Sequence, residues 1–180
     1  MSKIIADSKK ISDEILSLAD KIVDDCPDIS NLILIGIQRR GAQISQRILN
    51  VIKEKYNINV PLGVLDITFY RDDLSMVSEQ PIIHNTDIPF NLNKKYVVLV
   101  DDVIYTGRTI RSALDALVDF GRPSVVKLLA LVDRGMRELP IQPDYAGWII
   151  PTKYDDKISV KVVELDGEDL VEMITREDEL

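Results

Sequence analysis

The chain has 180 residues, of which 46% are hydrophobic and 29% charged, and its net charge is −8 at pH 7. This length and composition predict one globular domain over residues 1–180. The charge argues against a surface that is basic throughout, as is usual in nucleic-acid-binding proteins, but it allows a local basic patch. One cysteine and one histidine exclude an internal disulfide and a Cys/His zinc site. Any metal should therefore be a hard cation bound by oxygen atoms.

The sequence also bears on location. No apolar run reaches the roughly 18 residues that a membrane-spanning helix needs. The first ten residues, MSKIIADSKK, lack the charged-then-apolar order of a signal peptide. We therefore expect a cytoplasmic protein without a membrane partner.

Helical and strand patterns alternate along the first part of the chain. Apolar residues in positions 11–23 recur every three or four residues, which predicts an amphipathic helix. Residues 32–37, LILIGI, are apolar without a break, as in a strand buried on both faces, and a turn with Gly41 follows. Helical spacing returns over positions 44–52, and residues 61–70, PLGVLDITFY, predict another strand.

The second part opens with a long irregular stretch, residues 71–95, which is polar and has no sustained period. Loops of this length are uncommon in compact domains, so we expect either a lid over a binding site or a plain surface hairpin. Residues 97–100 form another buried run, and residues 124–133, SVVKLLALVD, another strand. Between them lies a helix whose buried face should comprise Ile110, Ala113, Leu114, Leu117 and Val118, with Gly121 as its C-cap.

This order of elements predicts an α/β fold, with a mostly parallel, doubly wound sheet and helices on both faces. Ligands of such sheets bind beyond the carboxyl ends of the strands. Four turns should therefore converge on one site, namely those that open at Gln38, Asp101 and Asp133, and the stretch that opens at Arg71.

Two adjacent carboxylates, Asp101 and Asp102, follow the buried run at 97–100. Acidic residues after a strand often only face water. An acidic pair in this place is also typical of phosphoacceptor receiver domains, but receivers place it near the chain start, whereas here a complete strand–helix unit precedes it. Carboxylates at this edge of a sheet can accept hydrogen bonds from the hydroxyls of a sugar, and they can stabilise positive charge that develops on its ring.

The next residues, YTGRT at 105–109, lie where a helix begins. Backbone N–H groups and the positive end of the helix dipole attract anions there. Gly107 would let the backbone close around a phosphate, while the Thr106 and Thr109 hydroxyls can donate to its oxygens. Thr and Gly are also ordinary capping residues. A ribose 5-phosphate would satisfy both this turn and the carboxylate pair, because it carries vicinal hydroxyls a short span from a phosphate.

Residues 97–109 resemble the phosphoribosyl pyrophosphate signature of type I phosphoribosyltransferases. The segments LDITFYRDDL, VDDVIYTGRTIRSALDALVDFGRPS and LVDRGMRELPIQPDYAG look like the family of bifunctional pyrimidine operon attenuation regulators and uracil phosphoribosyltransferases, PyrR. The resemblance runs over nearly all of the chain. It implies a type I phosphoribosyltransferase fold with a flexible lid or hood.

The resemblance implies that uracil and phosphoribosyl pyrophosphate react to give UMP and pyrophosphate, with Mg²⁺ present. The Mg²⁺ would be held through phosphoribosyl pyrophosphate, with Asp101 and Asp102 as the protein groups nearest to it and no dedicated ligand set. Carried over by position, the catalytic residues are Asp101, Asp102 and Arg71; the residues that bind phosphoribosyl pyrophosphate or UMP are Asp101, Asp102, Val103, Ile104, Tyr105, Thr106, Gly107, Arg108 and Thr109; those that bind pyrophosphate are Arg39, Arg40, Gly41 and Arg71; and those that border uracil are Asp133 and Arg134.

Some positions depart from the family pattern. Arg39 stands where the family commonly has threonine, and Trp148 and Ile149 replace polar residues near the expected base pocket. An alternative to the uracil enzyme is therefore a phosphoribosyltransferase for another base.

The family's second activity is binding of an RNA hairpin from the pyrimidine operon leader, which uridine nucleotides promote. Met136 and Gln142 stand where better-known RNA-binding members carry histidine and arginine, so we expect RNA binding to be weaker than catalysis. The alternative is a UMP-sensing RNA-binding regulator with little catalysis. Relatives suggest a homo-oligomer, a dimer or larger. The cations available for an RNA-binding patch are Lys9, Lys10, Arg134 and Arg137.

Overall fold

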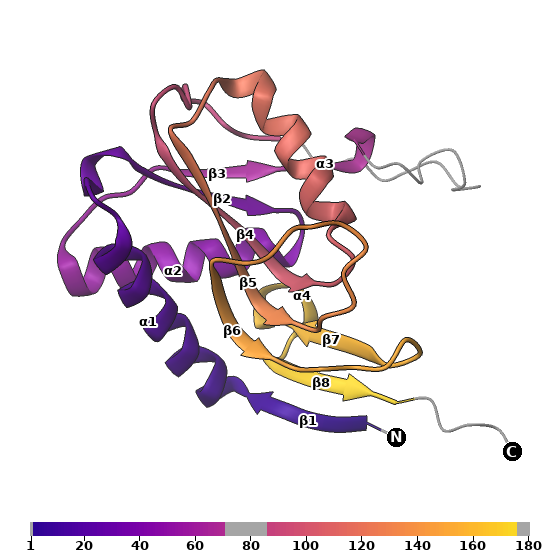
Figure 1. Cartoon of the computed structure of the whole chain (residues 1–180). Helices are drawn as coiled ribbons and strands as arrows, with labels where there is room; N and C mark the ends of the chain where they lie inside the picture. The colour runs from indigo at the N-terminus through magenta and orange to yellow at the C-terminus, as the bar shows by residue number, and fades with distance from the viewer. Residues whose placement is uncertain (1, 71–85, 176–180) are drawn as a thin grey trace, which may run out of the picture.

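The computed structural model of the chain describes residues 2–70 and 86–175. Its helices and strands are, in chain order, β1 (Ser2–Asp7), α1 (Ser8–Asp25), β2 (Leu32–Ile37), α2 (Arg40–Tyr56), β3 (Leu62–Leu65), β4 (Tyr96–Ile104), α3 (Arg108–Leu117), β5 (Val125–Asp133), β6 (Tyr145–Ile149), β7 (Lys157–Lys161), α4 (Val163–Asp166) and β8 (Leu170–Ile174). Figure 1 shows that they form a larger and a smaller sheet.

The larger sheet has five strands in the order β3-β2-β4-β5-β6. β2 pairs in parallel with β3 and β4, and the parallel pairing continues from β4 to β5 and from β5 to β6. The chain therefore winds one way from β2 to β3 and the other way from β4 to β6. In open α/β sheets the crevice at such a reversal is where ligands bind. The predicted doubly wound parallel sheet is confirmed.

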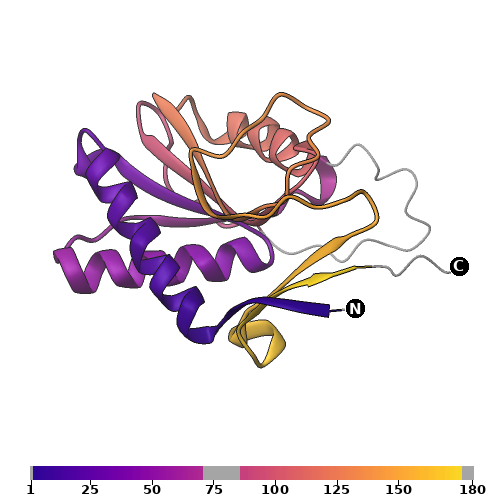
Figure 2. The ribbon, with the colours of Figure 1, turned by 60° about the horizontal axis from the view of Figure 1, so that its bottom comes forward.

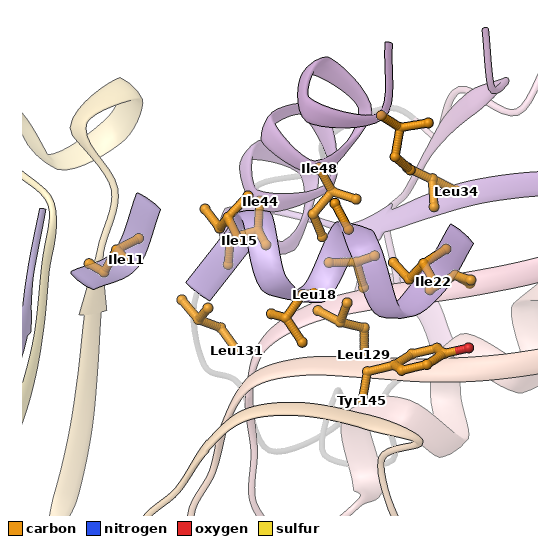
Figure 3. Packing of buried hydrophobic residues seen from close by; sticks show 14 of the residues in the cluster. Ile11, Ile15, Leu18, Ile22, Leu34, Ile44, Ile48, Leu129, Leu131 and Tyr145 are labelled. Carbon is orange, nitrogen blue, oxygen red and sulfur yellow. The ribbon is translucent and has the colours of Figure 1, made fainter. Parts of the chain in front are cut away.

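Helices cover both faces of this sheet. α1 and α2 lie on one face and α3 on the other (Figures 1 and 2). All six residues of β2 are buried, and alternate residues serve opposite faces: Leu34 packs with α1 and α2, whereas Ile33 and Ile35 pack with α3. Figure 3 shows the core between the sheet and the helices α1 and α2. Its side chains include Ile11, Ile15, Leu18, Ile22, Leu34, Ile44, Ile48, Leu129, Leu131 and Tyr145.

The buried face of α3 differs from the predicted one at two positions. Leu114 is 37% exposed and Val118 is 73% exposed. The buried stripe runs through Ala113 and Ala116, which leaves Leu114 at its margin. Val118 lies beyond the end of α3, in a 3₁₀ turn at Val118–Phe120. Gly121, with φ of 128°, ends this turn rather than the α-helix.

The smaller sheet joins segments that are far apart in the sequence. β8 pairs antiparallel with β1 on one side and with β7 on the other, and Ser2 lies opposite Ile174. We call β1, β7, α4 and β8 together the hood. Its buried residues belong to the same core cluster as α1 and α2: Ala6, Val160, Val162 and Val171. The sequence patterns do not predict these strands, because each is short and β1 pairs with a strand at the other end of the chain.

Only part of the predicted lid can be located. Residues 71–85, including Arg71, lie outside the described residues. In the rest of the stretch, Asp87 forms an antiparallel bridge with Val64, and Leu92 is fully buried. Within residues 2–70 and 86–175, none of the helices has the length and apolar character that crossing a membrane requires.

Candidate active site

A cavity of about 460 Å³ opens at the carboxyl ends of β2 and β4, where the winding of the sheet reverses. Three groups of residues meet there, one after β2, one after β3, and one at the end of β4 and the start of α3. The cavity therefore brings together the turns that open at Gln38 and Asp101. Its lining residues are Gln38, Arg39, Arg40, Asp66, Ile67, Thr68, Asp101, Asp102, Val103 and Thr109.

Two glycines allow α2 to approach the sheet closely beneath this cavity. A Cβ on Gly41 would lie 2.4 Å from the carbonyl oxygen of Val100 and 3.1 Å from the Cα of Asp101. A Cβ on Gly36 would lie 2.5 Å from the Cα of Ala42. Gly41 lies in the first turn of α2, not in the turn before it as the pattern suggests, because the helix begins at Arg40. The start of α2 thus rests on the backbone that carries the acidic pair.

Asp101 is buried, whereas Asp102 is half-buried and lines the cavity. Burial raises the pKa of Asp101 well above its ordinary value, and the neighbouring charge of Asp102 adds to this. Burial also raises the pKa of Asp102, although hydrogen bonds to its carboxylate and the charge of Arg40 oppose the shift. The Oδ1 atom of Asp101 accepts the backbone N–H of Asp102 at 2.9 Å, and the Oδ1 atom of Asp102 accepts that of Val103 at 2.9 Å. The two carboxyls therefore resist carrying two negative charges until a ligand supplies donors or cations.

The segment that follows β4 forms a small cradle of about 100 Å³ beside the cavity. Gly107 has φ of 93°, a left-handed conformation that glycine adopts without strain, and it stands at the N-cap of α3 without a side-chain cap. The helix start therefore presents backbone N–H groups, as an anion site does. The residues that line the cradle are Val103, Ile104, Tyr105, Thr106, Gly107, Thr109 and Ile110.

Arg108, predicted to bind the 5-phosphate, has its side chain at the surface. Its Nε donates to the Oε2 atom of Glu138 at 2.7 Å, and the two side chains are about half exposed. Its backbone N–H lies 3.3 Å from the Oγ1 atom of Thr106. Arg108 therefore contributes its backbone N–H to the 105–109 turn, whereas its guanidinium pairs with Glu138.

The arginines of the Gln38 turn both line the cavity. Arg39 is the N-cap residue of α2, and the Gln38–Arg39 peptide is cis. Arg40 interacts with the acidic pair, since its positive charge lowers the pKa of Asp102. Its guanidinium also makes an ion pair with Asp166 of the hood.

Asp133 and Arg134, predicted to border uracil, are not among the residues that line this cavity. Asp133 makes an ion pair with Arg137 at 2.8 Å and accepts the backbone N–H of Gly135 at 2.9 Å. Arg134 donates to the Thr152 hydroxyl at 3.0 Å, and its guanidinium lies 4.0 Å from the centre of the Tyr105 ring. Both residues thus form a corner behind the 105–109 turn.

The cations expected to bind RNA fall into two groups. Arg134 is buried, Arg137 is largely buried, and both are committed to protein partners, with Arg137 donating to the carbonyl oxygens of Tyr105 at 2.9 Å and Ile141 at 2.8 Å. Only Lys9 and Lys10, on the first turn of α1, are exposed. Of the four residues expected to form a surface patch, the two lysines are exposed and the two arginines mainly serve protein partners.

Three residues of the cavity were not singled out as site residues from the sequence. Asp66, Ile67 and Thr68 follow β3 and line the cavity together. The Oδ1 atom of Asp66 accepts the backbone N–H of Thr68 at 2.8 Å, which fixes this short segment. The signal available was their position after a predicted strand, within the segment LDITFYRDDL. Arg71, which follows them, lies outside the described residues.

The acidic groups do not form a ready-made metal cage. In the described ranges, no three or more His, Cys, Asp or Glu side chains are placed to hold a metal ion together. The carboxylate oxygens that line the cavity belong to Asp101, Asp102 and Asp66. Such a set suits a hard cation whose remaining ligands come from a phosphate and from water.

Known proteins share both the sequence and the fold. A model of the phosphoribosyl transferase domain matches residues 1–166. The Bifunctional protein PyrR of Acetivibrio thermocellus is 52% identical over 163 residues, 91% of this chain and 89% of that protein. The protein of the same name from Pelotomaculum thermopropionicum is 47% identical over 167 residues, 93% of this chain and 92% of that protein.

Among solved structures, the hypoxanthine phosphoribosyltransferase of Trypanosoma cruzi superposes with a TM-score of 0.72, at 18% identity and over 97% of each chain. This likeness shows the type I phosphoribosyltransferase fold. The domain match and the close relatives go further, and together they show that the chain belongs to the phosphoribosyl transferase family and, within it, to the bifunctional PyrR proteins.

Proposed function

We propose that the chain transfers a phosphoribosyl group from phosphoribosyl pyrophosphate to uracil and releases pyrophosphate, so that UMP is the product. The observation that carries this proposal is the placement of an acidic pair, buried Asp101 and half-buried Asp102, directly beside the cradle at Gly107. A ribose 5-phosphate fits that pair of features. The relatives named Bifunctional protein PyrR support the choice of uracil as the base.

The acidic pair acts on the ribose. Asp101 and Asp102 accept hydrogen bonds from its vicinal hydroxyls, which replace the water that burial has removed. As the bond at the anomeric carbon lengthens, positive charge develops on the ring, and two nearby carboxylates stabilise it. The 5-phosphate lies in the cradle, where the backbone N–H groups of Gly107 to Thr109 and the hydroxyls of Thr106 and Thr109 serve its oxygens.

Pyrophosphate leaves on the α2 side. Arg39 and Arg40 line the cavity there, and planar guanidinium groups match the oxygens of a polyanion. Gly41 lets the start of α2 approach closely. Arg71 completes this set by resemblance, at the opening of the predicted lid. A closed lid would keep water from hydrolysing the activated sugar.

The chemistry that Mg²⁺ would supply, bound together with phosphoribosyl pyrophosphate, is partial neutralisation of the charge on the leaving pyrophosphate. Asp101 and Asp102 are the carboxylates that would face it, and the absence of a preformed cage in the described ranges is compatible with a cation carried by the substrate.

Asp133 and Arg134 act on the base indirectly in this proposal. Both side chains already have protein partners, so we assign them to shaping the base-binding end through Tyr105 rather than to hydrogen bonds with uracil. Trp148, which pairs with Val132 across β5 and β6, belongs to the same end.

The test is a panel of uracil, hypoxanthine and guanine with phosphoribosyl pyrophosphate and Mg²⁺, assayed for nucleotide and pyrophosphate. We expect UMP only. Replacing both carboxylates, Asp101→Asn with Asp102→Asn, should lower turnover about a hundredfold or more, a loss of ~3 kcal/mol of transition-state stabilisation. Near-normal turnover by the double variant, or a purine nucleotide as the main product, would refute the proposal.

RNA regulation is the second half of the proposal. The relatives are named bifunctional, and family resemblance makes the partner a hairpin of pyrimidine operon leader RNA, bound in the cytoplasm by a homo-oligomer. Burial of Arg134 and Arg137 reduces the charge available to such a partner. We therefore place catalysis first and RNA binding second.

A further inference from the structure

Arg40 is held at the cavity by a carboxylate from a distant part of the chain. Its Nε donates to the Oδ2 atom of Asp166 at 3.1 Å, and its Nη2 donates to the Oδ1 atom at 2.7 Å. This two-point contact is the geometry in which a guanidinium and a carboxylate match best. Arg40 begins α2, beneath the cavity, whereas Asp166 ends α4 in the hood, 126 residues later.

Asp166 is itself fixed within the hood. Its Oδ2 atom accepts the backbone N–H of Val162 at 2.9 Å, and its own backbone N–H donates to the carbonyl of Val162 at 2.8 Å. Hydrogen bonding to Arg40 holds the pKa of Asp166 below its usual range. A rigid, charged acceptor therefore faces one edge of the guanidinium.

The other edge of Arg40 remains available to a ligand. Arg40 lines the cavity, whereas Asp166 does not. A guanidinium has five N–H donors, and in the described part of the chain no hydrogen bond uses the Nη1 group of Arg40. One side chain can therefore serve Asp166 and an anion in the cavity at the same time.

We propose that Asp166 is a positioning residue for Arg40, which it orients towards the pyrophosphate end of the substrate. The inference rests on the proposed function, because it takes that end of the substrate to lie beside α2. A free arginine side chain loses rotamer freedom when it binds a ligand, and a side chain already held in place loses less. Asp166 thus contributes to substrate affinity through Arg40.

A matched contact two helical turns further along α2 provides a control. Arg47 donates through Nε to Glu164 at 2.8 Å and through Nη1 to Asp169 at 3.0 Å. It therefore ties α2 to the same hood segment, but it does not line the cavity. Glu164→Gln removes a charge from α4 as Asp166→Asn does, while Arg40 keeps its partner.

The experiment is calorimetric titration of the wild-type protein, Asp166→Asn and Glu164→Gln with phosphoribosyl pyrophosphate plus Mg²⁺, and separately with UMP. Asp166→Asn should weaken phosphoribosyl pyrophosphate binding about tenfold, ~1.4 kcal/mol. UMP affinity should stay within about twofold, because UMP carries the 5-phosphate but no pyrophosphate for Arg40 to meet. Glu164→Gln should change neither affinity.

Each other outcome is decisive. Unchanged phosphoribosyl pyrophosphate binding by Asp166→Asn overturns the inference. Tighter binding overturns it as well, because Asp166 would then compete with pyrophosphate for Arg40. Equal losses for both ligands overturn it too, since they indicate general damage. Should Asp166→Asn not fold, Asp166→Glu carries the test, because it keeps the charge but displaces the carboxylate. A wild-type protein that does not bind phosphoribosyl pyrophosphate refutes the proposed function first.

Discussion

The guanidinium of Arg137 lies 2.8 Å from the carboxylate of Asp133, four residues earlier, and both side chains are 11% exposed. Arg137 also donates to the carbonyl oxygens of Tyr105, Gly135 and Ile141. An arginine in a glycine-containing loop is thus the centre of a buried polar network. It fixes the corner that supports the phosphate cradle, and it leaves little charge for a partner at the surface.

Replacement of Arg137 should therefore damage the fold itself. Arg137→Ala removes the cation that pairs with the Oδ2 atom of Asp133, and it removes a donor from three carbonyl groups, in a largely buried setting. We expect a loss of about 3 kcal/mol in the free energy of unfolding, measured by urea denaturation. Arg111→Ala, which breaks an exposed pair with Asp115, should cost less than about 0.5 kcal/mol. Equal effects of the two variants would contradict this account.

Asp101→Asn should stabilise the ligand-free protein at neutral pH while it impairs turnover. An acid whose pKa is raised by folding contributes stability that is fully present below its unfolded pKa, about 3.9, and is lost as the pH rises through the folded pKa. Burial raises the pKa of Asp101, so its ionisation opposes folding at neutral pH. Asparagine resembles the neutral acid and does not ionise.

Melting temperatures at several pH values measure this effect. Asp101→Asn should melt above the wild type at pH 7.5, and the difference should shrink as the pH is lowered towards 4. Asp13→Asn, at an exposed position of α1, serves as the control and should change little. A difference that is independent of pH would show that the carboxyl charge is not its cause.

Gly41→Ala should separate the start of α2 from the acidic pair. The added Cβ would meet the Val100 carbonyl oxygen at 2.4 Å, so either the helix or β4 must move. Overpacking of this kind costs about 1–3 kcal/mol, and the displaced Arg40 should lower turnover more than tenfold. Gln46→Ala, on the exposed face of the same helix, should retain both stability and activity. Wild-type kinetics for Gly41→Ala would argue against a role for this close approach.

RNA binding should be weak and steeply dependent on salt. The net charge of −8 opposes a polyanion at long range, and Lys9 and Lys10 are the exposed members of the predicted patch. A hairpin from the organism's own pyrimidine operon, tested by gel shift at physiological salt with and without UMP, measures the affinity. Tight, UMP-dependent binding that survives Lys9→Gln with Lys10→Gln would place the RNA on another surface.

The sequence predicted four of the five strands of the larger sheet, all except β6, because their signals are local. Residues 32–37 form an unbroken apolar run that only burial on both faces explains, and the turn around Gly107 lies beside its own helix. For the same reason the acidic pair and the cradle could be recognised together. That Arg40 lies at the same cavity as the acidic pair could be predicted from one rule, that the carboxyl ends of parallel strands lie at the same edge of a sheet.

Other features depend on contacts between distant segments, which no local pattern encodes. The family resemblance implied a hood, but no local pattern predicted its strands, since β1 pairs with β8, and the Arg40–Asp166 pair joins residues 126 positions apart. The burial of Arg137 was missed because an arginine in a polar loop ordinarily lies in water. Leu114 was predicted to be buried because it is large and apolar. The buried stripe of α3 instead runs through the small residues Ala113 and Ala116, which leaves Leu114 partly exposed.

The pairing of β1 with β8 also determines when the molecule can become complete during synthesis. The Ser2 hydroxyl donates to Glu172, 170 residues later, so the ribosome works for about 10 to 30 seconds between making the two strands. In that interval β1 has an unpaired edge, a state that favours pairing with other chains. Asp166 also emerges late, and a nascent chain therefore acquires its Arg40 contact only when translation of the hood is nearly finished. Prematurely terminated chains would carry the acidic pair and the cradle but not the contact that orients Arg40.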